Sequence, residues 1–460
     1  MQQNHSRFVY FICIVAAFGG LLFGYDWVVI GGAKPFYEVY FGISDDASAQ
    51  GLAMTMALVG CMIGATLCGK FADLVGRKRL LVVSSLIFFF SALATGAFNS
   101  FHAFLVARFF GGIGIGVASG LSPMYIAEVA PSQMRGKLVS LNQMTIVLGI
   151  LGAQVTNWLI AEPIAGGVVD VQSWNAQMGW RWMFWAAAAP AAVFFALALF
   201  IPESPRWQTL KGRVGQARAT LVRIGGEEYA ETEMRSIGEG IAADAKAAGL
   251  KALFSHRYAF VLMLGIFIAV FQQWCGTNVI FNYAQEVFQA AGYEVGDVLF
   301  NIVITGVANV LFTIVAIFTV DRWGRRTLML MGAGGLCTIY LLLGAGYYFH
   351  VTGMLMIVLV VAAIACYAMT LGPCTWVLIS ELFPNKVRAI GVATCTFALW
   401  VGSSTLTYTF PLLNQSLGSY GTFWIYALVC GVGFVFFLVR LPETKGKSLE
   451  ELERLLTGKK

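Results

Sequence analysis

Twelve long apolar runs, each about the length of a membrane-crossing helix, are the feature that most restricts what this chain can fold into. A bilayer core about 30 Å thick needs roughly 20 predominantly apolar residues per helix. The first run is too long for a signal-peptide core and lacks a small-residue cleavage site, so we expect it to be retained. The sequence therefore predicts an all-α membrane protein with twelve transmembrane helices. The runs are 8–32, 51–69, 80–98, 104–127, 138–160, 182–201, 258–284, 298–320, 327–349, 353–380, 389–410 and 422–440.

The composition argues against a soluble enzyme, a disordered chain and a nucleic-acid binder. Charged residues make up 12% of the 460 residues and apolar residues 58%, whereas soluble domains carry about 25% charged residues. The nine cysteines are scattered through apolar runs without a CxxC pair, and no histidine stands at metal-ligand spacing from them. We therefore expect buried apolar cysteines, no metal, no cofactor, no catalytic residues and no enzymatic activity.

Lysine and arginine are distributed unevenly between the two sides of the predicted spans. Twelve spans place both termini on one side, where 27 of the 30 cations fall, with Lys34 and Arg181 on the other side. The positive-inside rule then places the termini and the 202–257 segment in the cytoplasm. Compact external loops favour a bacterial-type cytoplasmic membrane. Topology explains the net charge of +6, so no nucleic-acid partner is needed.

Three short motifs occur twice, at offsets of 248, 253 and 240 residues. Two parallel halves of this kind are typical of transporters that rock around a site at the membrane mid-plane. The repeat predicts an N-terminal six-helix half (1–201), a cytoplasmic linker with short helices (202–257), a C-terminal six-helix half (258–441) and a cytoplasmic tail (442–460).

Each motif places charged residues at the cytoplasmic end of a helix. We expect ion pairs between the halves to close the cytoplasmic mouth. The alternative, a simple positive-inside anchor, accounts for the cations but not for the acids at matched places. The candidate gate residues are Asp73, Arg77, Glu128, Arg135, Glu203 and Arg206 in the first half, and Asp321, Arg325, Glu381, Arg388 and Glu443 in the second.

Two ionisable side chains stand well inside the apolar runs, namely Asp26 and Arg108. Charges within a membrane are costly and are functional candidates. Asp26 lies six residues before Gly32, and Arg108 lies six residues after His102. Both positions are near the outer ends of their spans, so we expect the two at one depth and in contact. Protonation of Asp26 would remove the pair and release Arg108. The hypothesis is that Asp26 carries a coupled proton and Arg108 tunes its proton affinity. The alternative is a static ion pair.

The interior of the second-half runs contains no charged residue, which favours a neutral, hydroxyl-rich ligand over an ion. Amides both donate and accept hydrogen bonds, and they concentrate in run 258–284. Asn278 and Asn282 share a helix face there, and Gly276 is the predicted break in the helix. For any single amide the alternative is helix–helix contact. The candidate amides are Gln143, Gln272, Gln273, Asn278, Asn282 and Asn309.

The chain resembles the sugar porter family of the major facilitator superfamily over essentially its full length. The most specific motifs are Pro202-Glu-Ser-Pro-Arg206, Pro442-Glu-Thr-Lys-Gly446 and Gly372-Pro-x-x-Trp376-x-x-x-Ser380-Glu381-x-Phe-Pro384. The likeness is nearest to bacterial proton-linked pentose and hexose symporters, above all those for xylose. It implies symport of a monosaccharide with a proton by alternating access, and we expect a monomer in the lipid bilayer.

The resemblance also implies a set of substrate contacts. The segment Gly19-Gly20-x-x-Phe23-Gly24-x-Asp26 resembles proton-linked members, whereas passive facilitators usually lack the acid. By resemblance, the sugar contacts fall on Phe23, Gln143, Gln272, Gln273, Asn278, Asn309, Gly372, Trp376 and Trp400.

Three positions depart from the xylose-symporter pattern. Ala187 stands where a Glu is expected, Asn282 where a Tyr is expected, and Leu399 where a Gln is expected. A lost hydrogen bond to a sugar hydroxyl alters discrimination, so the identity of the sugar is not implied. The alternatives are a passive sugar facilitator with a structural Asp26–Arg108 pair, and a non-transporting sugar sensor, which the short tail after Val439 disfavours.

Overall fold

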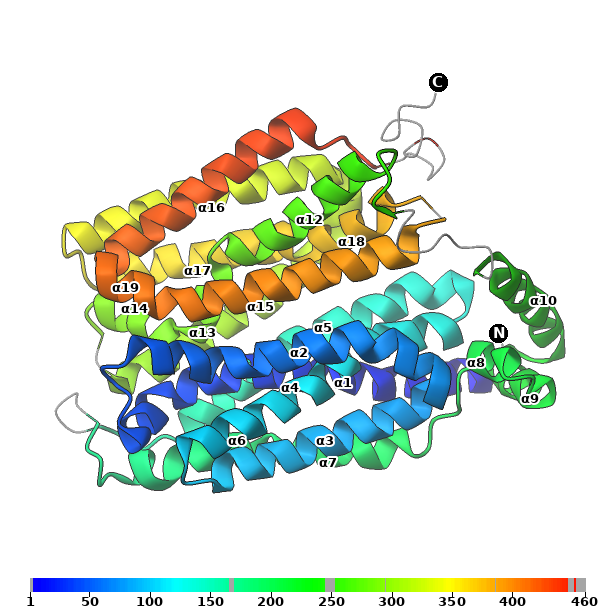
Figure 1. Ribbon diagram of the computed structural model, residues 1–460, viewed down its shortest axis with the longest axis horizontal. Helices are drawn as coiled ribbons and strands as arrows, with labels where there is room; N and C mark the ends of the chain where they lie inside the picture. The colour runs from blue at the N-terminus through cyan, green and yellow to red at the C-terminus, as the bar shows by residue number, and fades with distance from the viewer. Residues whose placement is uncertain are drawn as a thin grey trace. The chain divides into compact units, whose positions relative to one another are not determined.

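The structure, a computed structural model, describes residues 3–164, 169–244, 253–293, 295–384, 386–445 and 451. Over these residues the chain forms helices and no β-strand (Figure 1). Contacts divide it into two compact units. Unit 1 consists of Met1–Asp26, Gly60–Ile150 and Phe184–Ala247, and unit 2 of Trp27–Val59, Leu151–Met183 and Ala248–Lys460. The halves expected from the sequence repeat, 1–201 and 258–441, stay a prediction.

Unit 1 is a helical bundle in which glycines allow close helix packing. A Cβ atom on Gly60 would lie 2.1 Å from the carbonyl oxygen of Phe109, and one on Gly116 would lie 2.3 Å from that of Cys61. Small residues at such crossings are how membrane helices bring their backbones together. The bundle contains α3 (Arg77–Ala97), α4 (Phe101–Val129) and α7 (Ala188–Ala198), with parts of α1 (Gln3–Phe41), α2 (Ala47–Val75), α5 (Ser132–Ile160) and α6 (Trp180–Ala186).

Three short helices follow the bundle of unit 1. They are α8 (Pro205–Leu210), α9 (Val214–Gly225) and α10 (Glu227–Asp244), which pack together (Figure 1). Ser204 caps α8 by accepting a hydrogen bond from the backbone N–H of Trp207 at 3.3 Å. The ring of His5 hydrogen-bonds with the carbonyl of Arg223 at 3.0 Å, which ties these helices to the beginning of α1.

Unit 2 contains the later helices of the chain. The last helix, α19, covers 53 residues. At 1.5 Å per residue this is about 80 Å, which is too long for one bilayer crossing. Gly418 interrupts it with φ 67° and ψ 174°, and Figure 1 shows the chain turning back there. The two arms match the expected runs 389–410 and 422–440. The helices are α12 (Ala259–Trp274), α13 (Thr277–Asn282), α14 (Ala284–Ala290), α15 (Val295–Trp323), α16 (Arg325–Tyr348), α17 (Met354–Met369), α18 (Leu371–Leu382) and α19 (Arg388–Arg440).

The first helix is longer than the apolar run predicts. It continues from residue 32 to Phe41 and keeps Lys34 and Glu38 buried. Lys34 and Glu38 are therefore buried charges that lie beyond the end of the first apolar run. The helix can continue because Lys34 and Glu38, one turn apart, carry opposite charges and contact each other.

Candidate functional site

The two buried charges predicted to pair do so within unit 1. A guanidinium nitrogen of Arg108 on α4, Nη1, donates to Oδ1 of Asp26 on α1 at 2.5 Å. The Arg108 and Asp26 side chains are only 4% and 8% exposed. The guanidinium also lies 5.4 Å from the centre of the Phe184 ring, close enough for a cation–π contact. The expected contact between α1 and α4 is confirmed.

This pair has one bond that protonation can remove. A carboxylate accepts the hydrogen bond from Arg108, whereas a carboxylic acid gives up the charge that holds the cation. The Nε atom of Arg108 has no hydrogen-bond partner among the described residues. A buried arginine left without its counter-charge is costly, so the charge of Asp26 stabilises Arg108 at this place.

A row of amides forms the polar part of unit 2. Gln272 and Gln273 end α12, and Asn278 lies in α13. Asn278 donates to the amide oxygen of Gln273, and Gln273 donates to that of Gln272. Gln272 in turn donates to the hydroxyl of Tyr367 on α17. We call these four residues the amide row. All three amides are buried, and each retains hydrogen-bonding capacity for a further neutral ligand.

The break that presents these amides lies at the predicted glycine. Gly276 adopts φ 87°, a left-handed conformation that favours glycine, and it separates α12 from α13. A Cβ atom there would lie 2.9 Å from the ring of Tyr426. A broken helix frees backbone and side-chain polar groups at the same point, which is how many transporters form a ligand site.

The other predicted sugar contacts of unit 2 lie on several helices. Asn309 on α15 and Asn282 on α13 are buried, and the Oδ1 atom of Asn282 has no hydrogen-bond partner among the described residues. Gly372 follows the break between α17 and α18 at Thr370. Trp400 is buried with its ring centre 6.1 Å from that of Trp27, whereas Trp376 is 42% exposed.

Two predicted contacts, Phe23 on α1 and Gln143 on α5, belong to unit 1. The structure therefore gathers the remaining candidates in unit 2 and places these two in the other unit.

Sequence reasoning missed Tyr367 and Trp27, as well as the charges of Lys34, Glu38 and Glu286. Tyr367 stands in an uninterrupted apolar run, where a tyrosine gives no signal of its own. Lys34 and Glu38 lie just beyond the end of the first apolar run. Their spacing of four residues was the available signal, because opposite charges at that spacing share a helix face.

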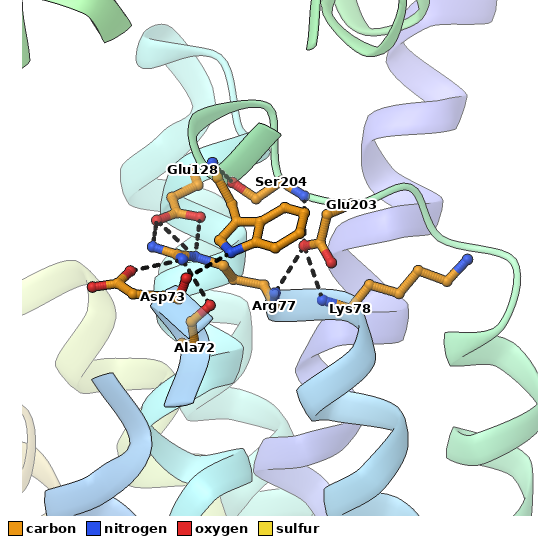
Figure 2. A network of polar contacts seen from close by, with 8 residues as sticks. Ala72, Asp73, Arg77, Lys78, Glu128, Glu203 and Ser204 are labelled. Atoms are coloured by element: carbon orange, nitrogen blue, oxygen red, sulfur yellow. Dashed lines mark hydrogen bonds and ion pairs between the residues drawn. The ribbon is translucent and has the colours of Figure 1, made fainter. Parts of the chain in front are cut away.

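The first motif cluster is a network around Arg77, shown in Figure 2. The Nε and Nη2 atoms of Arg77 donate to the carboxylate of Glu128, with bonds of 2.9 Å, and Nη1 donates to Asp73 at 2.8 Å. Glu203 accepts from the backbone N–H groups of Arg77 and Lys78 at 2.8 and 3.1 Å. Glu203 therefore satisfies unpaired donors at the beginning of α3, where a negative charge is stabilised.

The second motif cluster repeats this arrangement in unit 2. Arg325 donates to Glu381 at 3.2 Å, and Glu443 accepts from the backbone N–H groups of Arg325 and Arg326 at 3.0 and 3.2 Å. Thr444 adds a hydrogen bond to Glu381 at 2.7 Å. Burial tends to raise the pKa of Glu443, but four backbone N–H donors outweigh it and hold the pKa below its usual value.

The other predicted gate residues are Arg135, Arg388, Arg206 and Asp321. Arg135 contacts Glu233 of α10 at 3.7 Å, and Arg388 donates to the carbonyl of Phe383 at 3.1 Å. Arg206 lies in α8. The side chain of Asp321 lies outside the described residues. The side-chain ion pairs of Arg77 and of Arg325 each join residues of the same expected half, so a gate between the halves stays a prediction.

The sequence and the fold match known proteins over the whole chain. A family model described as "Sugar (and other) transporter" matches residues 12–456. The arabinose-proton symporter of Bacillus subtilis (strain 168) is 35% identical over 457 residues, covering 99% of this chain and 97% of that protein. The D-xylose-proton symporter of Escherichia coli (strain K12) is 36% identical over 483 residues, covering 98% of this chain and 96% of that protein.

A solved structure shares the architecture as well. The inward-open conformation of the xylose transporter XylE from Escherichia coli aligns with a TM-score of 0.86 and 34% identity. The alignment covers 97% of this chain and 100% of that one. Together with the matched family, it identifies a multi-pass membrane protein with the major facilitator fold, a transporter rather than an enzyme. The chain belongs to the sugar transporter family.

Proposed function

We propose that this protein moves a neutral monosaccharide, a pentose or hexose, together with a proton across the cytoplasmic membrane by alternating access. In this proposal two six-helix halves, 1–201 and 258–441, rock around a central sugar site in a monomer. The termini and the motif clusters face the cytoplasm, where the clusters reorganise as the inner mouth opens. The relatives, which are named as sugar–proton symporters, support the sugar as a ligand.

The Asp26–Arg108 pair is the observation that carries proton coupling. Both groups are buried, and the guanidinium of Arg108 donates a hydrogen bond to the carboxylate of Asp26. A proton that arrives at Asp26 removes the charge that holds Arg108, so proton binding and helix rearrangement are linked.

The amide row supports an uncharged ligand. Amides and a phenol can donate to and accept from sugar hydroxyls without a counter-charge, and Trp400 can pack against the apolar face of a sugar ring. The remaining predicted contacts are Phe23, Gln143, Asn282, Asn309, Gly372 and Trp376. Leu399, buried beside Trp400 in the chain, offers no hydrogen bond. We infer that this site accepts a different ranking of sugars from a site that carries glutamine there.

Transport into proteoliposomes tests proton coupling. A panel of labelled sugars is offered with and without an inward proton gradient, using wild type and Asp26→Asn. We expect wild type to concentrate one sugar above the external level and Asp26→Asn to reach only an inside-to-outside ratio of about 1, because its neutral amide cannot exchange a proton. Sugar exchange across the membrane should persist in the variant.

Asp45→Asn, an exposed aspartate between α1 and α2, is the matched control and should behave as wild type. If the gradient makes no difference to wild type, or if Asp26→Asn still accumulates sugar, proton coupling through Asp26 is wrong. In the first case the protein is a passive facilitator in which Asp26 and Arg108 form a structural pair, and in the second case another group carries the proton.

A further inference from the structure

Three charged side chains form a buried cluster in unit 2 that neither the sugar site nor the proton site uses. Lys34 and Glu38 lie on α1, and Glu286 lies on α14. The Lys34 ammonium is 2.8 Å from Oε1 of Glu38 and also donates to Oε1 of Glu286. The side chains of Lys34, Glu38 and Glu286 are 3%, 8% and 22% exposed. We call these three residues the Lys34 cluster.

The cluster joins helices that come from different repeats. Its α1 residues belong to the first set of six spans, and α14 follows the seventh apolar run. The backbones here are too close for larger residues. A Cβ atom on Gly31 would lie 3.0 Å from the carbonyl oxygens of both Phe281 and Asn282, and one on Gly32 would lie 2.2 Å from the amide nitrogen of Asn157. The Lys34–Glu286 contact therefore joins α1 to α14 at a place where α1 also packs closely against α13 and α5.

Further contacts between the two repeats surround this point within unit 2. The hydroxyl groups of Ser48 on α2 and Tyr408 on α19 lie 3.0 Å apart. A Cβ atom on Gly306 of α15 would lie 1.8 Å from the amide oxygen of Gln154 on α5. These contacts lie on parts of α1, α2 and α5 that are remote from the motif clusters in sequence, and they indicate a closed end of the transport path.

Lys34 has two partners of different kinds. Glu38 is four residues away on the same helix, so it stays beside Lys34 wherever α1 moves. Glu286 stays beside Lys34 only while α1 and α14 are together. One ammonium between two carboxylates leaves an excess negative charge, so Glu38 and Glu286 repel each other in the closed arrangement. Glu286 therefore favours the closed arrangement, whereas Glu38 opposes it.

We propose that the Lys34 cluster is a latch at the extracellular end of the transport path. Lys34 holds Glu286 when that end is closed, and it falls back on Glu38 when the end opens, so the cation is never left buried without a partner. This inference rests on the proposed alternating access and on the proposed orientation of the termini. It assigns Glu286 to the closed state and Glu38 to the open state.

Hydrogen–deuterium exchange of the full-length protein in lipid nanodiscs tests the latch at fixed pH, without a proton gradient. Glu286→Gln should speed exchange of peptides from 27–41 and 283–290 by about tenfold, as expected for loss of a charge-assisted hydrogen bond. Glu38→Gln should slow exchange of the same peptides, because it removes both the fallback partner and the repulsion. Glu162→Gln, an exposed glutamate of unit 2, is the control and should change neither.

Exchanging the charges of Lys34 and Glu286 shows whether an effect comes from the ion pair and not from poor folding of a single variant. Lys34→Glu and Glu286→Lys should each speed exchange, whereas the double variant should return it toward the wild-type rate because the pair is restored. The latch is wrong if Glu286→Gln and Glu38→Gln shift exchange in the same direction, if either has no effect, or if the double variant gives no rescue. Since no step of this test needs transport or a gradient, failure of proton coupling is seen separately in the proteoliposome experiment.

Discussion

At the residue scale, the two buried ion pairs of this transporter differ in what can separate them. Asp26 and Arg108 lie on helices of the same repeat and within one compact unit. Lys34 and Glu286 lie on helices of different repeats. A relative movement of the repeats can break the second pair but leaves the first together. The first pair is therefore suited to respond to a proton, and the second pair is suited to respond to movement of the repeats.

Tyr367 offers a test of the amide row at this scale. Tyr367→Phe removes the hydroxyl that accepts from Gln272 and leaves a buried amide donor without a partner, which costs about 1–3 kcal/mol. We expect about tenfold weaker sugar binding and an altered order of preference among sugars, measured by titration calorimetry in detergent.

Tyr347→Phe is the matched control for that measurement. It also removes a buried hydroxyl, which donates to the carbonyl of Val287 at 2.7 Å, but it leaves the amide row intact. It should lower stability without changing sugar affinity. Equal affinities of Tyr367→Phe and wild type would show that the hydroxyl does not position Gln272 for the ligand.

The residue-scale predictions from sequence succeeded where a polar group stood out against an apolar run. Asp26 and Arg108 were found in this way, and their contact is confirmed. Tyr367 could not be found because its ring belongs in an apolar run and only its hydroxyl takes part in the row. Glu286 was missed because it follows an apolar run, and folding α14 against α1 buries it only in part.

At the element scale, breaks in the helices contribute more to the proposed sugar site than the regular helical segments do. Gly276 breaks the seventh span, the chain breaks again at Thr370 before Gly372, and Gly418 separates the last two spans. The first two breaks place polar groups or aromatic rings at points where a regular helix would hide its backbone. The third is a simple reversal. Only the first two belong to the proposed sugar site.

Gly276→Ala tests the seventh-span break. Alanine in a left-handed conformation costs about 1–2 kcal/mol, and its Cβ would press on the Tyr426 ring. We expect a lower melting temperature together with reduced sugar affinity, since the amide row is anchored on both sides of the break. Thermal unfolding in detergent and sugar titration measure the two effects.

Gly238→Ala provides the comparison for this substitution. Gly238 lies inside α10 with open space around it and no left-handed conformation, so alanine should leave stability unchanged or raise it. A Gly276→Ala protein that melts and binds as wild type does would mean that the break is not needed to hold the amides in place.

The apolar runs predicted nearly every membrane helix because apolar length is what a bilayer selects. The ends of the helices were less predictable. The first run stops near residue 32, yet α1 continues to Phe41, where Lys34 pairs with Glu38 and, once α14 has packed against α1, also with Glu286. A local hydropathy pattern does not show that buried charges will pair with residues of another helix.

At the scale of the whole molecule, the two motif clusters are copies of one design. In each, a glycine with positive φ precedes an arginine that begins a helix, and a glutamate from the segment after the sixth or twelfth span caps that helix. Gly76 with Glu203 and Gly324 with Glu443 are the two copies. The repeat was predictable from the motif spacing, whereas the capping by these glutamates was not, since it requires distant segments to meet.

The lowered pKa of Glu443 predicts how stability depends on pH. A carboxyl group whose pKa is lower when folded stabilises the protein above its unfolded pKa, about 4.3 for glutamate, and loses this contribution as pH falls through the folded pKa. We expect Glu443→Gln to melt about 1–2 °C below wild type at pH 7, with the difference shrinking as the pH falls below about 4. Glu239→Gln, exposed on α10, should show no difference at either pH. A gap that persists undiminished at low pH would contradict ionised capping.

The position of Glu443 also affects how the protein is handled. Glu443 and Thr444 come after the final membrane helix. Glu443 binds the beginning of α16, and Thr444 binds the Glu381 carboxylate. The backbone N–H of Lys445 still bonds to Glu443. A purification tag or fluorescent reporter fused directly to Arg440 would remove these hydrogen bonds, so fusion points belong beyond Lys445.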